Sequence, residues 1–280
     1  MIPGAFNALT AKLAERLGFE AVYLSGGALS AGWAGLPDIG LLSLTEFTEQ
    51  AAVLARATSL PLLCDADTGF GEAVNVERTV RLFEEAGAAG IHLEDQVLPK
   101  RCGHLSGKSL VEPATMAAKV RAAVSARLDP AFVIVARTDA RSVEGFKGAV
   151  DRARLYVEAG ADMIFPEALE SADEFARFAR SVAIPILANM TEFGRSPLLT
   201  LDELGALGCR AALYPLTAFR AAMHAAELAL RTLRDEGTQR PVLDRMQTRA
   251  ELYDLLGYSA WEARDRAYFG TSEDGPGRLP

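Results

Sequence analysis

The sequence predicts an α/β protein that folds as one TIM-type (β/α)8 barrel with additional C-terminal helices. Short apolar, β-branched runs alternate with longer amphipathic runs over the first three quarters of the chain. The short runs are apolar almost throughout, as parallel strands are when helices cover both faces of the sheet. A glycine often follows an amphipathic run, as in EEAGAAGIHL, and ends the helix before the next strand. Eight such strands with intervening helices favour a closed barrel over an open sheet.

The expected elements follow one another in this rhythm. The strands are expected at residues 1–5, 21–26, 61–67, 90–95, 132–139, 162–168, 185–190 and 211–215. The helices between them are expected at residues 5–17, 44–58, 76–88, 113–126, 145–159 and 171–182. A C-terminal extension, about 216–268, holds a long amphipathic helix at 216–235 and a second helical stretch at 245–268. We therefore expect a single domain over 1–270 and a disordered tail, TSEDGPGRLP, at 271–280.

Composition excludes several classes of protein. The 280 residues include 29 basic and 37 acidic side chains, and a net charge of −8 without a basic stripe excludes a nucleic-acid binder. The three cysteines lie far apart and lack CxxC spacing, so a disulfide framework or a structural zinc site is not expected. No apolar run reaches the length of a membrane span, and the N-terminus lacks the features of a signal peptide. We expect a cytoplasmic protein without a nucleic-acid or membrane partner.

Polar residues gather where the expected strands end. In barrels of this kind, the chemistry lies at the C-terminal ends of the strands and in the loops that follow them. The polar residues at these positions are Ser25, Gly26, Gly27, Asp65, Asp67, Glu94, Asp95, Arg137, Asp139, Glu167, Asn189, Thr191 and Glu192. A polar group at the end of nearly every strand indicates a shared site, and this common location weighs more than any single motif.

The segment CDADTGFG carries two of these acids. Side chains alternate along a strand, so Asp65 and Asp67 are expected to project the same way. Two neighbouring carboxylates repel each other unless a cation lies between them or one stays protonated. Oxygen ligands, completed by water and substrate, suit Mg²⁺, and Glu94 at the end of the next strand could join through water. The alternative is that the aspartates only cap the turn before TGFG.

Two further strand ends could bind anions. In YLSGG, Ser25, Gly26 and Gly27 could present backbone N–H groups to a carboxylate or phosphate, although a plain glycine turn would look the same. Arg137, at the end of a buried strand, needs an anionic partner. That partner could be Glu94 or Glu167 in a structural ion pair, or a substrate carboxylate held by the guanidinium fork.

The segment KRCGHLSGK follows the strand at 90–95 and is expected to be a movable lid. It places Cys102 among the basic residues Lys100, Arg101, His104 and Lys108. Cationic neighbours lower the pKa of a thiol, so we expect a thiol that gives up its proton readily and acts as a general acid. The alternatives are a surface thiol without a role and a nucleophilic cysteine.

Together these segments resemble the isocitrate lyase and phosphoenolpyruvate mutase superfamily. The resemblance rests on KRCGH after a strand ending in LEDQ, on CDADTGFG, and on NMTEFGRSP, YPLTAFRAA and QTRAELYDLLGY, and covers nearly the whole chain. The chain is most similar to the lyases that cleave 2-methylisocitrate, because the KRCGH loop is specific to lyases. The resemblance implies cleavage of this tricarboxylate into pyruvate and succinate in propionate breakdown by the methylcitrate cycle. It also implies Mg²⁺, with Mn²⁺ as a substitute, no organic cofactor, and a homotetramer with exchanged C-terminal helices.

The resemblance also implies roles for individual residues. Asp65 and Asp67 would hold the metal, with Glu94 through water and Asp38 nearby. Cys102 would be the general acid, and Tyr23 would handle the proton of the C2 hydroxyl. The implied substrate-binding residues are Ser25, Gly26, Gly27, Cys102, Gly103, His104, Arg137, Glu167, Asn189, Met190, Thr191, Arg220 and Arg249. Phe165 stands where isocitrate-cleaving relatives carry tryptophan, and the smaller ring would leave space for a methyl group.

Other functions stay open at this point. The chain could cleave a related acid such as 2,3-dimethylmalate or isocitrate. It could instead be an oxaloacetate decarboxylase or a phosphonopyruvate-processing enzyme of the same fold, for which the cysteine would matter little. It could also be a non-catalytic barrel that binds dicarboxylates.

Overall fold

The computed structural model describes residues 1–105 and 107–269. The chain divides into two compact units, Met1–Met223 and His224–Pro280, which are described separately. The expected tail at 271–280 lies outside the described residues. The single domain over 1–270 stays a prediction.

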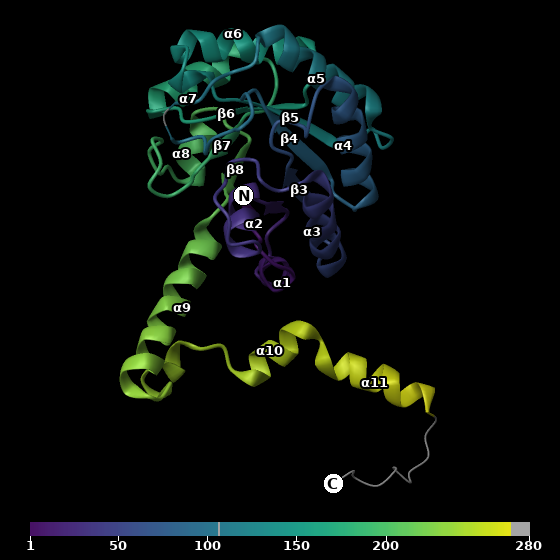
Figure 1. Ribbon diagram of the computed structural model, residues 1–280, viewed down its shortest axis with the longest axis vertical. Helices are drawn as coiled ribbons and strands as arrows, with labels where there is room; N and C mark the ends of the chain where they lie inside the picture. The colour runs from purple at the N-terminus through teal and green to yellow at the C-terminus, as the bar shows by residue number, and fades with distance from the viewer. Residues whose placement is uncertain (106, 270–280) are drawn as a thin grey trace. The chain divides into compact units, whose positions relative to one another are not determined.

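The first unit is the expected barrel (Figure 1). Its parallel strands are β1 (Ile2–Pro3), β2 (Val22–Leu24), β3 (Leu62–Asp65), β4 (Gly90–Glu94), β5 (Val133–Thr138), β6 (Met163–Pro166), β7 (Leu187–Asn189) and β8 (Ala211–Tyr214). They pair in two arcs, β2-β3-β4-β5-β6 and β1-β8-β7. The bridges Gly4–Tyr23 and Ile164–Ile186 join the arcs, so the strands close into a ring in chain order. The (β/α)8 prediction is confirmed.

Helices surround this ring. They are α1 (Ala8–Arg16), α2 (Gly26–Gly32), α3 (Leu44–Ala57), α4 (Ala73–Glu85), α5 (Pro113–Ala126), α6 (Gly145–Glu158), α7 (Ala172–Ser181) and α8 (Leu201–Ala206). The sequence reasoning missed α2 and α8, since seven and six residues are too short to show a helical period. In each case a cap starts the helix: the side chain of Ser25 accepts from the N–H of Ala28, and Thr200 forms a capping box with Glu203.

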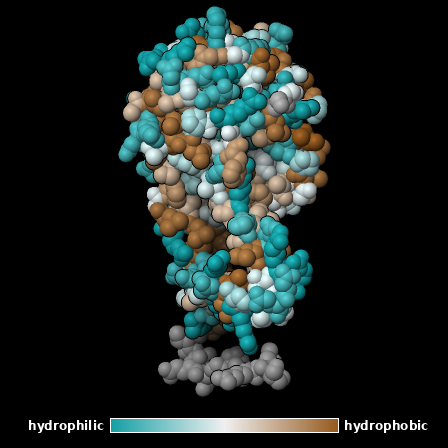
Figure 2. All heavy atoms as spheres, turned by 90° about the vertical axis from the view of Figure 1, so that its left-hand side faces the viewer, coloured by the Kyte–Doolittle hydropathy of each residue, from teal (hydrophilic) through white to brown (hydrophobic). Residues whose placement is uncertain are grey.

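The core lies in two layers, one inside the barrel and one between the strands and helices. The inner cluster is built from buried side chains on alternate strand positions, namely Tyr23, Val135, Phe165, Leu187 and Leu213. The residues between them on the strands, such as Ile134, Ile164 and Ala188, face the helices and join the larger outer cluster. Burial on both faces explains why the strands are apolar runs. On one outer face, Figure 2 shows hydrophilic side chains interspersed with smaller apolar patches.

The second unit is helical. The helix α9 (Thr217–Glu236) runs into it from the first unit, and a 3₁₀ turn, Arg240–Arg245, follows. Two short helices, α10 (Arg249–Leu256) and α11 (Tyr258–Tyr268), meet at Gly257, whose φ of 65° is the left-handed conformation that ends α10. Within the described part of the chain, no helix is both long and apolar enough to span a membrane.

Candidate active site

A cavity of about 480 Å³ lies at the C-terminal ends of the strands, and we call it the strand-end cavity. This is the place where barrels carry their chemistry. It is lined by Tyr23, Ser25, Gly27, Asp38, Asp65, Lys100, Cys102, Gly103, His104, Arg137, Phe165, Glu167, Asn189, Thr191, Leu213, Pro215 and Leu216. Residues from strand ends far apart in the sequence therefore meet around one space, as the shared location of the polar residues predicts.

The acids of CDADTGFG lie on one side of this cavity. Asp65 is the last residue of β3 and accepts hydrogen bonds from the N–H groups of Asp67 (2.9 Å) and Gly26 (3.1 Å). Asp67 lies beyond the strand, with a φ of 44°, so strand alternation does not set its direction as the sequence reasoning assumed. Its Oδ1 lies 2.7 Å from Lys100 Nζ, which also pairs with Asp38.

These acids fit a hard divalent cation that keeps much of its water. Burial raises the pKa of Asp67 to about 6, with a smaller rise from the charge of Asp65, and the nearby charge of Lys100 opposes this rise. Glu94 is buried, and its Oε1 has no hydrogen-bond partner within the described chain. No three His, Cys, Asp or Glu side chains of the described residues could hold a metal by themselves. Mg²⁺ commonly uses one or two carboxylates and leaves the remaining positions to water and substrate.

Arg137 is surrounded by acids. It is paired with Glu94 in the β4–β5 register, and its Nη1 lies 3.1 Å from Glu94 Oε2. Its Nε donates to Asp139 Oδ2 at 3.0 Å, and its Nη2 lies 3.4 Å from Glu167 Oε2. The guanidinium also lies over the ring of Phe165, 5.1 Å from its centre. Both ion-pair partners considered from the sequence are present, and the arginine still lines the cavity.

The structure corrects the expected state of the Cys102 thiol. Burial raises the pKa of Cys102 above its ordinary value, although the backbone N–H of His104 and the charge of Arg137 lower it. The loop cations are engaged elsewhere: Lys100 pairs with Asp38 and Asp67, and Lys108 Nζ lies 2.7 Å from Asp139. The sequence reasoning was wrong here because neighbours in sequence are not neighbours in space.

The backbone of the Cys102 loop also lies close to Arg137 and Glu167 at the cavity. A Cβ on Gly103 would overlap Arg137 Nη2 and the side chain of Glu167, so only glycine fits there. His104 Nε2 lies 2.9 Å from Glu167 Oε1, and Asn189 Nδ2 donates to Glu167 Oε2 at 3.3 Å. Glu167 therefore joins the loop to β6 and β7.

Several residues implied by the resemblance do not line the cavity. The N–H of Gly26 donates to Asp65 instead of facing a ligand. Met190 is buried, and its sulfur accepts from the N–H of Leu199. Arg220 donates to the carbonyl of Glu192 and lies over Phe193. Asp67 and Glu94 are not among the residues that line the cavity, and Arg249 begins α10 in the second unit. Their substrate or metal roles stay predictions.

His92 is a site residue that the sequence reasoning missed. Its Nε2 lies 2.7 Å from the hydroxyl of Tyr23 and 3.5 Å from Asp65 Oδ1. Burial raises the pKa of Tyr23, so this hydroxyl keeps its proton. The signal was present in GIHLED, where a histidine interrupts an apolar strand and, by the β3–β4 register, stands beside Asp65.

Comparison with known proteins identifies the family of this chain. The model of the phosphoenolpyruvate phosphomutase family matches residues 1–234. The 2-methylisocitrate lyase of Aeropyrum pernix is 55% identical over 94% of this chain and 84% of its own length. A crystal structure of 2,3-dimethylmalate lyase has a TM-score of 0.90 at 34% identity, covering 99% of this chain and 93% of its own.

A phosphonopyruvate hydrolase solved with oxalate and Mg²⁺ is also similar, with a TM-score of 0.86 at 35% identity over 96% of this chain and 94% of its own. The family match and these identities extend over the strands that carry the cavity. The chain therefore belongs to the phosphoenolpyruvate mutase and isocitrate lyase superfamily.

Proposed function

We propose that the protein cleaves 2-methylisocitrate into pyruvate and succinate. One observation carries this proposal: Cys102, Asp65 and Arg137, which come from three different strand ends, line the same cavity. The 55% identity to a 2-methylisocitrate lyase favours this substrate over 2,3-dimethylmalate, whose lyase is 34% identical. Phe165 forms part of the cavity wall, where its size can influence which substituent the substrate carries.

The chain's own residues supply the binding and the proton transfers. Arg137 and the N–H groups of the loop would bind substrate carboxylates and stabilise charge as the bond breaks. The C2–C3 bond pair passes to the succinate carbon, and the proton of the Cys102 thiol is delivered there. The C2 hydroxyl proton passes to the hydroxyl oxygen of Tyr23 while Tyr23 gives its own proton to His92 Nε2, which lies 2.7 Å away. A thiol with a raised pKa suits this role, because a general acid must hold its proton until the carbanion forms.

We propose Mg²⁺ as the cofactor, held by Asp65 and Asp67 with Glu94 reached through water. When bound, it would polarise the oxygen that becomes the carbonyl of pyruvate. Dialysis of the purified protein against EDTA should abolish pyruvate release, and Mg²⁺ or Mn²⁺ should restore it. Full activity after EDTA would exclude this cofactor.

The deciding experiment is a coupled assay of pyruvate release with Mg²⁺ present. It should compare 2-methylisocitrate, isocitrate and 2,3-dimethylmalate as substrates. We expect the highest kcat/KM with 2-methylisocitrate. A higher value for 2,3-dimethylmalate would reassign the substrate, and release of pyruvate from none of the three would favour a binding protein.

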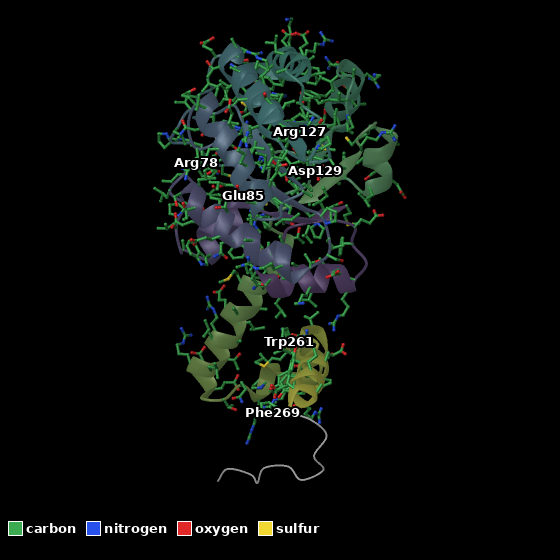
Figure 3. All side chains as sticks on the ribbon, turned by 90° about the vertical axis from the view of Figure 1, so that its right-hand side faces the viewer. Arg78, Glu85, Arg127, Asp129, Trp261 and Phe269 are labelled. Atoms are coloured by element: carbon green, nitrogen blue, oxygen red, sulfur yellow. The ribbon has the colours of Figure 1, made fainter. Side chains whose placement is uncertain are left out.

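We also propose a cytoplasmic homotetramer that exchanges its C-terminal helices. The support is the apolar surface of the second unit: Trp261 in α11 and Phe269 directly after it, both labelled in Figure 3, are 65% and 80% exposed. Exposed aromatic side chains gathered on one short helical segment are typical of an interface. Light scattering after size exclusion should give the mass of four chains, and shortening the chain after residue 248 should give a smaller species.

A further inference from the structure

Lys108 is a buried cation that the proposed chemistry does not use. Its side chain is 0% exposed, and its Nζ lies 2.7 Å from Asp139 Oδ1. The same amine donates to the backbone carbonyl of Gly103. A buried ammonium is costly unless charges and hydrogen bonds compensate it, so both partners are needed to keep it there. Lys108 therefore ties the backbone beside Cys102 to the end of β5.

The carboxylate of Asp139 accepts hydrogen bonds from both Lys108 and Arg137. Its Oδ1 accepts from Lys108 and from Arg137 Nη2 at 3.1 Å, and its Oδ2 accepts from Arg137 Nε at 3.0 Å. Its side chain is 0% exposed, so water does not screen these pairs. One carboxylate therefore sets the position of the guanidinium and the distance of the loop from it.

A rigid support holds Asp139. Its N–H donates to Asp95 Oδ1 at 2.9 Å. Asp95 Oδ2 in turn accepts from Thr138 Oγ1 and from the hydroxyl of Tyr156, each at 2.8 Å. These partners come from β5 and α6, and Asp95, Thr138 and Tyr156 are fully buried. Asp139 is thus an anchor fixed to the barrel wall and not a mobile surface acid.

We propose that Lys108 and Asp139 are positioning residues that hold the Cys102 loop at a fixed distance from Arg137. Neither has to touch the substrate. Lys108 acts through the Gly103 carbonyl, and Asp139 acts through both Lys108 and the guanidinium. Misplacing a reacting group by about 1 Å can cost about 100-fold in rate, so a short link of this kind bears directly on turnover.

The first test measures the thiol and needs no substrate. Wild type, Lys108→Met and Asp139→Asn are treated with iodoacetamide at several pH values, and the labelling of each cysteine is followed by peptide mass spectrometry. Loss of the link should raise the Cys102 labelling rate at every pH by about 5- to 30-fold, the factor expected when a local structure loses one charged hydrogen bond. Cys64 and Cys209 are buried and should keep their slow rates. Lys147→Met, which removes an exposed lysine paired with Asp151, is the matched control and should change nothing.

The second test measures turnover and rests on the proposed function. Lys108→Met should lower kcat for 2-methylisocitrate by about 10- to 100-fold, with a smaller change in KM. An unchanged Cys102 labelling rate in both variants would overturn the proposal. A rise at all three cysteines would also overturn it, because that shows a general loss of structure. If wild type releases no pyruvate from any acid, the proposed function fails, and the labelling rates still decide the role of Lys108.

Discussion

Replacing Arg137 by methionine should destabilise the barrel unit strongly. The side chain of Arg137 is 10% exposed and lies 3.0 to 3.4 Å from Asp139, Glu94 and Glu167. Methionine fills a similar volume but leaves these buried acids without their shared cation. Removing one partner of a buried ion pair costs about 3–5 kcal/mol. For a unit of this size, about 2–4 °C of melting temperature is lost per kcal/mol, so a fall of about 6–20 °C is expected.

The measurement is thermal unfolding of wild type, Arg137→Met and Arg78→Met. Arg78 is exposed on α4 and labelled in Figure 3, so its replacement should change stability by no more than about 0.5 kcal/mol. A fall for Arg137→Met no larger than that of the control would refute the reasoning. Since pyruvate release is not part of this assay, the result does not depend on the substrate.

The loss of stability caused by Arg137→Met should also depend on pH and should become smaller in acid. Burial raises the pKa of Glu167, but Arg137 and His104 outweigh it and hold this pKa below its ordinary value. A carboxyl with a depressed folded-state pKa stabilises the fold above its unfolded pKa of about 4.3, and this contribution is lost as the pH falls through the folded value. The stability difference between wild type and Arg137→Met should therefore be full at pH 7 and should shrink below about pH 4.

Three further predictions concern the cavity. Cys102→Ala should lower pyruvate release by about 10²–10⁴-fold with little change in melting temperature, and retention of most activity would instead support phosphonopyruvate or oxaloacetate chemistry. In the wild type, the iodoacetamide labelling rate of Cys102 should reach half its maximum above pH ~8.5, the ordinary thiol value, and a midpoint below it would contradict the effect of burial. Phe165→Trp should shift the kcat/KM ratio from 2-methylisocitrate toward isocitrate by about 10- to 200-fold, and an unchanged ratio in the coupled assay would show that this wall does not contact the methyl group.

The sequence predicts the fold well because its signals are local and repeated. Each strand is an apolar run covered by helices, so every one of the eight expected runs contains a strand of the barrel. The observed strands are shorter than expected, as β3 shows by ending at Asp65 instead of 67. The apolar run at 61–67 also includes the first buried residues of the loop that follows β3. The helices α2 and α8 were missed because one or two turns leave no measurable period, and only their caps mark them.

The site is predicted less completely, because it depends on contacts between strand ends. Position along the chain identifies Asp65, Arg137 and Cys102 as residues that can share one rim, and they line one cavity. Position along the chain does not show which acidic side chain pairs with which basic one. Lys108 lies six residues from Cys102 in the sequence, yet its partner Asp139 is 31 residues further along. Arg220 and Met190 follow the motifs of the resemblance, but their side chains are engaged by Glu192 and Leu199.

The Cys102 thiol keeps its predicted role as a general acid, although its pKa was predicted in the wrong direction. The sequence suggests that basic neighbours favour the thiolate of Cys102, whereas burial keeps the thiol protonated. A group that must donate a proton to a carbanion should begin the reaction with that proton, so the buried thiol suits a general acid better than a thiolate would. The basic residues then have another purpose. Lys100 binds Asp67, His104 binds Glu167 and Lys108 binds Asp139, and each contact fixes one point of the loop to a different strand end. Lys100 and Lys108 thus neutralise Asp67 and Asp139, and together with His104 they hold the loop that carries the sulfur.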